Sequence, residues 1–169
     1  MESINKFDNY CYNKVQQLPF GPIVNISTII GHPVVISSEL FILGLSLVRN
    51  NYQTIGWSIL IQIPLLVSIS LIKIAVRRIR PLKHFQAQVL IDTYSFPSGH
   101  AYATTVLSGT LIYALSQFGH HELAIATAIS MFFVTLVVGI TRVYIKAHYM
   151  SDVLAGWALG ILAVILIYR

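Results

Sequence analysis

Three short groups of polar residues interrupt an otherwise apolar chain, and their residue types are those that bind and attack phosphate. They are Lys73 with Arg80 and Pro81, then Pro97, Ser98, Gly99 and His100, then Arg142, His148 and Asp152. Arginine offers a planar fork of donors to phosphate oxygens, lysine a mobile charge, and histidine a nucleophile or proton donor near neutral pH. Each group stands at the end of an apolar segment. The sequence therefore predicts a phosphate site at the ends of helices.

The first group is rich in cations. Lys73 and Arg80 are seven residues apart, which is two helical turns, so we expect them and Arg77 to project from one helix face toward a single anion. Basic side chains at a membrane boundary also snorkel toward water. For Arg78 and Lys83 we favour that simpler interpretation.

The second group opens an apolar helix. Unpaired backbone N–H groups and the positive end of the helix dipole gather at such a place, which suits an anion. Ser98 can cap the helix or donate its hydroxyl, and Gly99 permits a close approach of the backbone to a ligand. A capping turn alone would explain both residues. It leaves His100 unexplained, and an imidazole at this position is well suited to protonate a leaving oxygen.

The third group contains a carboxylate and a histidine at helical spacing. His148 and Asp152 are four residues apart, so the carboxylate can accept a hydrogen bond from one ring nitrogen and leave the other for attack. An isolated histidine near a membrane boundary is usually only an interfacial polar residue, and Ser151 with Asp152 could simply cap a helix. The neighbouring groups favour the catalytic interpretation.

The composition places the chain in a bilayer. Of 169 residues, 56% are hydrophobic and only 10% are charged, which is unlike a soluble domain. The net charge of +5 comes from basic residues at the segment boundaries, so we expect no nucleic-acid partner. The single cysteine, Cys11, excludes an internal disulfide.

Apolar segments predict an all-α bundle with about five membrane spans in a single domain over 1–169. Four segments approach the twenty residues that a span needs, at 54–72, 101–119, 123–141 and 153–168. A fifth span is expected at about 33–48, after a short half-buried or re-entrant stretch. Within the segment 54–72, Pro64 should bend the helix without breaking it. Residues 1–21 predict an amphipathic interfacial anchor before the transmembrane core at 22–169, with Phe7, Cys11, Val15 and Leu18 at helical spacing.

Alternate crossings of the bilayer place all three polar groups on the same side. His120 and His121 then fall on the opposite side. Glu39, inside the span expected at 33–48, should face the bundle in a structural role. Gly156 and Gly160 form a small-residue seam that we interpret as packing within the chain.

The order and spacing of the three groups resemble the tripartite signature of the type 2 phosphatidic acid phosphatase superfamily, over about residue 25 to the C-terminus. Thr141 stands where that family usually has serine, and many of its membrane members have six spans. The resemblance implies that His148 is a nucleophile oriented by Asp152 and that His100 is the general acid and base. It also implies that phosphate is bound by five residues, Lys73, Arg80, Ser98, Gly99 and Arg142.

We therefore expect an integral-membrane lipid phosphatase that uses no cofactor. The absence of a carboxylate cluster in the sequence argues against a metal. Expected substrates are an isoprenyl diphosphate such as undecaprenyl diphosphate first, then phosphatidylglycerol phosphate or phosphatidic acid. The oligomeric state stays open. The rival interpretations are an enzyme like the vanadium haloperoxidases and a non-catalytic lipid-binding or transport protein on the same fold.

The expected location is a bacterial or archaeal cell membrane. The resemblance implies an extracytoplasmic active site. The positive-inside rule points the other way, because basic residues are concentrated on the catalytic side. We discount the rule here, because phosphate binding accounts for Lys73, Arg80 and Arg142.

Overall fold

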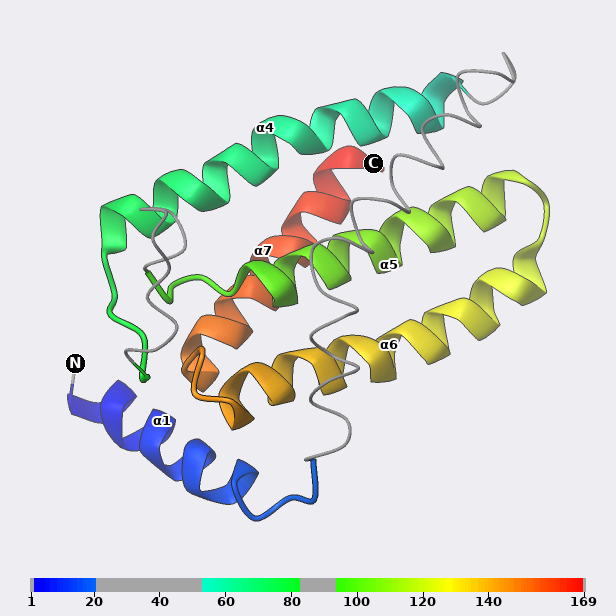
Figure 1. Cartoon of the computed structure of the whole chain (residues 1–169). Coiled ribbons are helices and arrows are strands. Elements are labelled where there is room, and N and C mark those ends of the chain that lie inside the picture. The colour runs from blue at the N-terminus through cyan, green and yellow to red at the C-terminus, as the bar shows by residue number, and fades with distance from the viewer. Residues whose placement is uncertain (1, 21–52, 83–93, 169) are drawn as a thin grey trace.

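Five helices form in the part of the chain that this computed structural model describes, which is residues 2–20, 53–82 and 94–168. They are α1 (Glu2–Val15), α4 (Gln53–Val76), α5 (Gly99–Gln117), α6 (His121–Tyr144) and α7 (Met150–Ile167) (Figure 1). Extended pairing within these ranges is limited to one isolated bridge between Ile79 and Tyr94. The all-α prediction is confirmed for these residues. The expected span at 33–48, Glu39 and Lys83 lie outside them.

Two helices in the described ranges, α6 and α7, are long and apolar enough to cross a membrane. Their outer faces carry large apolar side chains that are more than half exposed, among them Ile125, Phe133, Ile161 and Ile165. So much exposed apolar surface calls for an apolar surrounding. Helix α4 continues through Pro64 without a break, as the sequence predicted. The count of five spans stays a prediction.

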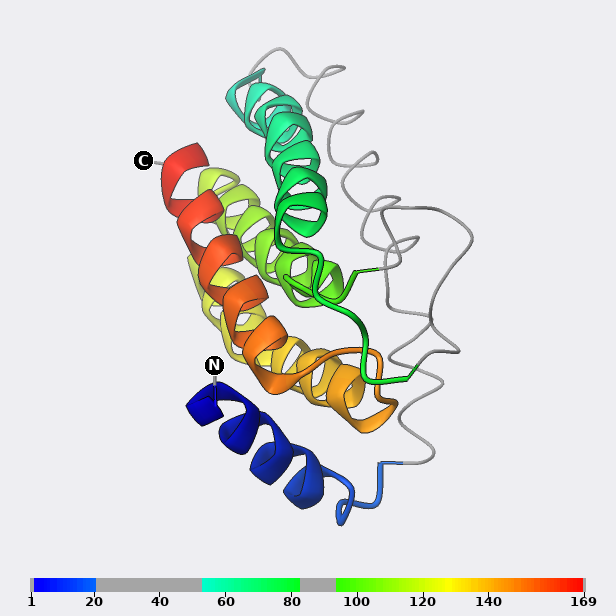
Figure 2. The same cartoon turned by 90° about the vertical axis from the view of Figure 1, so that its left-hand side faces the viewer.

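Helix α5 is the centre of the bundle, packed between α6 and α7, with α4 on a further side (Figures 1 and 2). Glycines allow α7 to approach it closely. A Cβ atom at Gly156 would lie 2.5 Å from the carbonyl oxygen of Ser98, and one at Gly160 would lie 2.7 Å from Cβ of Thr105. The seam predicted at these two glycines is therefore confirmed as packing within the chain.

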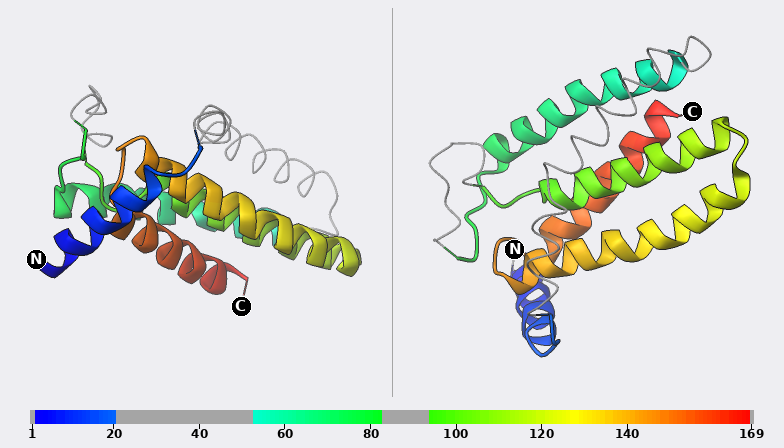
Figure 3. Two further views of the ribbon diagram at one scale, coloured as in Figure 1. Left: turned by 90° about the horizontal axis from the view of Figure 1, so that it is seen from below. Right: turned by 45° about the vertical axis from the view of Figure 1, so that its right-hand side comes forward.

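The N-terminal helix α1 lies across one end of the bundle and contacts both α6 and α7 (Figure 3). Val15 is buried in a cluster with Ala101, Val143 and Val153. The predicted helix is present but ends at Val15, so Leu18 lies beyond it and is exposed. This position brings α1 beside the loop that joins α6 to α7.

The ends of the helices decide where the polar groups lie. The C-terminal ends of α4 and α6 and the N-terminal ends of α5 and α7 come together at the end of the bundle that α1 covers (Figures 1 and 3). The turn between α5 and α6, which contains His120 and leads into His121 at the start of α6, lies at the opposite end (Figure 1). The three polar groups of the sequence therefore share one end of the molecule.

Candidate active site

A helix-terminating turn positions His148. After α6 the backbone takes a left-handed conformation at Lys146, with φ 60°. The N–H of Lys146 donates to the carbonyl of Val143 at 3.0 Å, and the N–H of Ala147 donates to the carbonyl of Arg142 at 3.1 Å. This pair of bonds is the Schellman arrangement that ends many helices. The N–H of His148 donates to the same Arg142 carbonyl at 3.2 Å, so the turn fixes the histidine over the end of α6.

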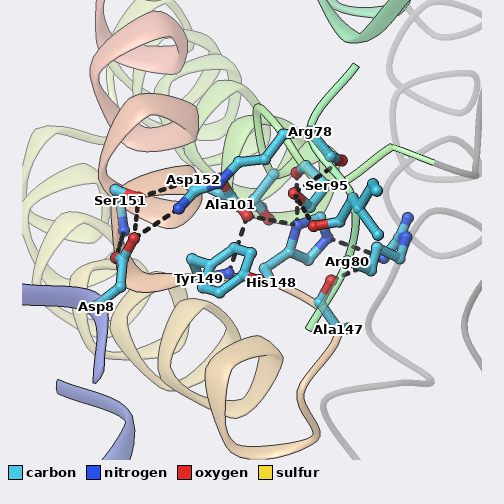
Figure 4. A network of polar contacts seen from close by, with 12 residues as sticks. Asp8, Arg78, Arg80, Ser95, Ala101, Ala147, His148, Tyr149, Ser151 and Asp152 are labelled. Atoms are coloured by element: carbon cyan, nitrogen blue, oxygen red, sulfur yellow. Dashed lines mark hydrogen bonds and ion pairs between the residues drawn. The ribbon is translucent and has the colours of Figure 1, made fainter. Parts of the chain in front are cut away.

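The buried imidazole of His148 has a distinct partner on each ring nitrogen (Figure 4). Nδ1 lies 2.7 Å from the carbonyl oxygen of Ser95. Because a carbonyl only accepts, this contact requires the proton on Nδ1 and leaves a lone pair on Nε2. Nε2 lies 3.4 Å from Nη1 of Arg80. The reactive nitrogen thus points toward a cation, where an anionic group would be held.

Asp152 supports this arrangement from a greater distance than expected. Its Oδ2 atom lies 3.8 Å from Nδ1 of His148, which is an ion-pair distance and too long for a hydrogen bond. The same oxygen accepts the N–H of Tyr149 at 2.9 Å, and Oδ1 accepts from Nη1 of Arg78 at 2.7 Å. The predicted hydrogen bond from the ring to Asp152 is therefore replaced by the bond to Ser95.

Burial lowers the pKa of His148 below its ordinary value of 6.5, and the nearby charges of Arg80 and Lys73 lower it further. The carboxylate of Asp152 opposes this shift without reversing it. The imidazole is therefore neutral at neutral pH, which a nucleophile requires.

The cations reach the site from separate segments. Lys73 is buried in the last turn of α4, and Arg142 is buried in the last turn of α6. Arg80 lies beyond α4, where its Nη1 also donates to the carbonyl of Ala147 at 3.1 Å. The charge of Arg80 acts on both Arg142 and His148. Arg80 and Lys73 thus place positive charge beside His148, and the charge of Arg142 acts on that of Arg80.

The expectation that Lys73, Arg77 and Arg80 share one helix face is wrong. Helix α4 ends at Val76, and Arg77 takes a left-handed conformation with φ 51°. Arg77 is exposed and donates from Nε to the carbonyl of Ile74 at 3.0 Å. Arg80 arrives instead through an extended segment, next to the bridge between Ile79 and Tyr94.

The second polar group caps α5 as predicted. Ser98 is the N-cap residue, and its hydroxyl accepts the N–H of Ala101 at 3.4 Å. Its own N–H donates to the backbone carbonyl of Asp152 at 3.0 Å, which ties the start of α5 to α7. Gly99 is buried beside it. His100 follows in the first turn and is partly exposed.

Sequence reasoning missed three features of the site. They are Ser95, Asp8 and the ion pairs of Arg78. Snorkelling is the wrong interpretation of Arg78, because its side chain is only 22% exposed and its guanidinium forms ion pairs with Asp8 and Asp152, each at 2.7 Å. Ser95 acts through its main chain, which no side-chain pattern reveals. Asp8 carries a weak signal in the sequence, since it lies three residues before Cys11 and seven before Val15 and so shares a helix face with them.

A cavity of about 280 Å³ opens beside His148. Asn9 and Tyr12 of α1 line it together with Lys146 and Tyr149. Helix α1 thus forms one wall of the space next to the histidine. Within the described ranges, no group of three or more histidine, cysteine, aspartate or glutamate side chains is gathered as a metal site.

Comparison with known proteins finds similarity in both sequence and fold. The chain is similar to phosphatidylglycerophosphatase B of Bacillus subtilis (strain 168), with 32% identity over 96 residues that cover 54% of this chain and 45% of the relative. It therefore spans less than half the length of that relative. The fold is similar to the crystal structure of a transmembrane PAP2 type phosphatidylglycerolphosphate phosphatase from Bacillus subtilis, with a TM-score of 0.74 and 21% identity over 99% of this chain and 86% of that one. The family model of the PAP2 superfamily matches residues 51–169, and the chain belongs to this superfamily.

Proposed function

We propose that the protein is an integral-membrane lipid phosphatase that works through a phosphohistidine on His148 without a metal. One observation carries the proposal. The buried imidazole has its proton on Nδ1, held by the Ser95 carbonyl, while Nε2 faces the guanidinium of Arg80. This is the geometry of a nitrogen nucleophile next to an anion site.

In the proposed reaction, the Nε2 lone pair of His148 attacks phosphorus, and the bond from phosphorus to the lipid oxygen breaks. His100 gives its proton to the leaving oxygen. His100 then takes a proton from water, the hydroxide attacks the phosphohistidine, and inorganic phosphate leaves with the nitrogen lone pair restored. Nδ1 keeps its proton throughout. Asp152 stabilises the positive charge that the ring acquires on phosphorylation, since its carboxylate lies 3.8 Å away.

Binding of the transferred group falls to the surrounding donors. Lys73, Arg80 and Arg142 would neutralise its equatorial oxygens, with the Ser98 hydroxyl and the N–H groups near Gly99. Phosphoryl transfer depends mainly on positioning and charge neutralisation, which this set supplies. These side chains supply positive charge of the kind that divalent ions supply in other phosphoryl-transfer enzymes, and this supports a metal-independent reaction.

The substrate class follows from the surroundings of the site. It lies at the ends of helices whose outer faces are apolar, so a lipid tail can stay in the bilayer while its phosphate enters. The printed names of the relatives favour phosphatidylglycerol phosphate, and the compact site is also compatible with isoprenyl diphosphates and phosphatidic acid. We further propose about five spans and an extracytoplasmic active site.

Phosphate release from these lipids in excess chelator, compared between the parent protein and His148→Ala, tests the proposal. We expect the parent to release phosphate from at least one lipid, to form an acid-labile phosphoenzyme, and to lose both properties in the variant. Phosphate release that persists in His148→Ala would show that His148 is not the nucleophile. Strict dependence on an added divalent ion would overturn the metal-free mechanism.

A further inference from the structure

Asp8 of α1 is a buried carboxylate whose partners all belong to the site end of the bundle. Its Oδ1 accepts the N–H of Ser151 in the first turn of α7 at 2.9 Å. Its Oδ2 accepts from the Ser151 hydroxyl at 2.9 Å and from Nη2 of Arg78 at 2.7 Å. A buried charge is tolerated only when it is paired and hydrogen-bonded in this way. The contacts connect the N-terminal helix to the first turn of α7, which also carries Asp152.

Arg78 joins this carboxylate to the nucleophile by two routes (Figure 4). Through its side chain, Nη1 donates to Oδ1 of Asp152 at 2.7 Å and to the Ser151 hydroxyl at 2.6 Å. Through its main chain, its carbonyl accepts the N–H of Ser95 at 2.8 Å, and the carbonyl of Ser95 in turn holds Nδ1 of His148. The guanidinium also stacks over the ring of Tyr149, 4.0 Å from its centroid.

The charges of this cluster have a consequence for His148. Burial works against the charged form of Arg78, but its bonds to Asp8 and Asp152 raise its pKa above the ordinary value, so it stays a cation. Asp8, Arg78 and Asp152 together then carry one net negative charge. Without Asp8, Arg78 would neutralise Asp152 completely. Nothing negative would remain in the cluster to stabilise the cationic ring formed when His148 is phosphorylated.

We propose that Asp8 is a positioning residue that holds Arg78, and thereby preserves the negative charge of Asp152 for the nucleophile His148. The proposal rests on the proposed function of the site. It gives α1 a part in the reaction beyond anchoring, because the helix supplies the carboxylate that balances Arg78. Asp8 acts through Arg78 and Asp152 and does not itself touch the reacting atoms.

The charged groups that face His148 define the test. They are Asp152 from α7, Arg80 from the segment after α4, and Lys73 from α4. Only the cluster that contains Asp152 changes when Asp8 is neutralised. In Asp8→Asn the protonated imidazole loses support, so the acid limb of kcat/KM should move to lower pH. The same loss should lower kcat by roughly ten- to hundredfold, the range seen when an outer partner of a metal-ligating histidine is removed, with little change in KM.

Three further variants separate charge from packing. Glu122→Gln removes an exposed carboxylate at the far end of the bundle and should leave kcat and the pH limb unchanged. Asp8→Glu keeps the charge, so the limb should stay at the parental pH even where kcat falls. Asp8→Asn combined with Arg78→Gln restores one net negative charge, and we expect its limb to return toward the parental pH.

Either a limb that does not move in Asp8→Asn, or a limb that stays shifted in the double variant, would overturn the proposal and leave Asp8 as an anchor of α1. If the parent releases no phosphate from any lipid, the proposed function fails. The coupling is then read from the NMR titration of the His148 ring. A lower midpoint in Asp8→Asn than in the parent supports the coupling, and an unchanged midpoint refutes it.

Discussion

The Nδ1 atom of His148 lies 2.7 Å from the carbonyl oxygen of Ser95, so a main-chain group fixes the tautomer of the ring. In many histidine nucleophiles and bases a carboxylate has this task. Here the carboxylate of Asp152 stands 3.8 Å away and is bonded to Arg78 and to the backbone of Tyr149. Orientation of the ring and stabilisation of its charge are thus divided between two groups.

This division predicts a graded effect of substitution at Asp152. In Asp152→Asn the Ser95 carbonyl still holds the ring, while the negative charge that stabilises the phosphorylated ring is lost. We expect kcat to fall by about 10² to 10³, the scale on which a single electrostatic contact acts in a transition state, with a phosphoenzyme still detectable. Single-turnover phosphate release, compared with that of His148→Ala, measures it. Loss as complete as in His148→Ala would mean that Asp152 also orients the ring.

The lowered pKa of His148 predicts the pH dependence of the reaction. Only the neutral ring can attack, and burial with the charges of Arg80 and Lys73 keeps it neutral below its ordinary pKa of 6.5. Activity should therefore persist as the pH falls through 6.5 and decline only at lower pH. The measurement is kcat/KM against pH, corrected for ionisation of the substrate phosphate. A decline that starts well above pH 6.5 would contradict a lowered pKa.

Gly156 predicts a link between helix packing and activity. A methyl group there would lie 2.5 Å from the Ser98 carbonyl, which is backbone and cannot rotate away. Gly156→Ala should push the start of α5 from α7, lower the free energy of unfolding by about 1 to 3 kcal/mol, and reduce kcat. Gly160→Ala is the matched control, since its clash with Thr105 lies one turn farther from the site. We expect a comparable loss of stability there with kcat largely retained. Equal kcat values in both variants would show that the contact between Gly156 and Ser98 does not affect activity.

Much of this arrangement could be predicted from the chain, because apolar segments fix the helices and alternate crossings bring their ends together. The expected segments at 101–119, 123–141 and 153–168 correspond to α5, α6 and α7 with small shifts of their ends. Ser98 caps α5 because a small hydroxyl residue before an apolar run has a local physical reason to do so.

The parts that sequence reasoning missed depend on contacts between distant segments. A spacing of seven residues from Lys73 predicts Arg80 on the same helix, but α4 ends four residues before Arg80, at Val76. The sequence favours a snorkelling role for Arg78 and does not reveal its two carboxylate partners, because these lie 70 and 74 residues away along the chain. Spacing in the sequence therefore predicts which residues lie at the site, but it does not predict which hydrogen bonds they form there.

The left-handed backbone at Lys146 predicts a site for stabilisation. A side chain at φ 60° is strained, so Lys146→Gly should raise the free energy of unfolding by about 1 kcal/mol. Gly119 is the reciprocal control, since its φ is 79° and no atom lies within 4 Å of an added Cβ. Gly119→Ala should lower stability by a similar amount through backbone strain alone. Thermal unfolding in detergent measures both. A less stable Lys146→Gly would show that the contact between Lys146 and Tyr12 outweighs the strain.

The proposed extracytoplasmic site predicts which end of the bundle an impermeant thiol reagent can reach. Gln17 is exposed beside Gln16, which donates to the Tyr144 carbonyl at the site end, whereas His120 is exposed at the opposite end. With Cys11 replaced by serine, Gln17→Cys should react on intact cells and His120→Cys only after lysis. Two such positions are needed because failure at one alone could reflect local burial. The reverse pattern would place the site in the cytoplasm, and the concentration of basic residues on that side would then follow the positive-inside rule.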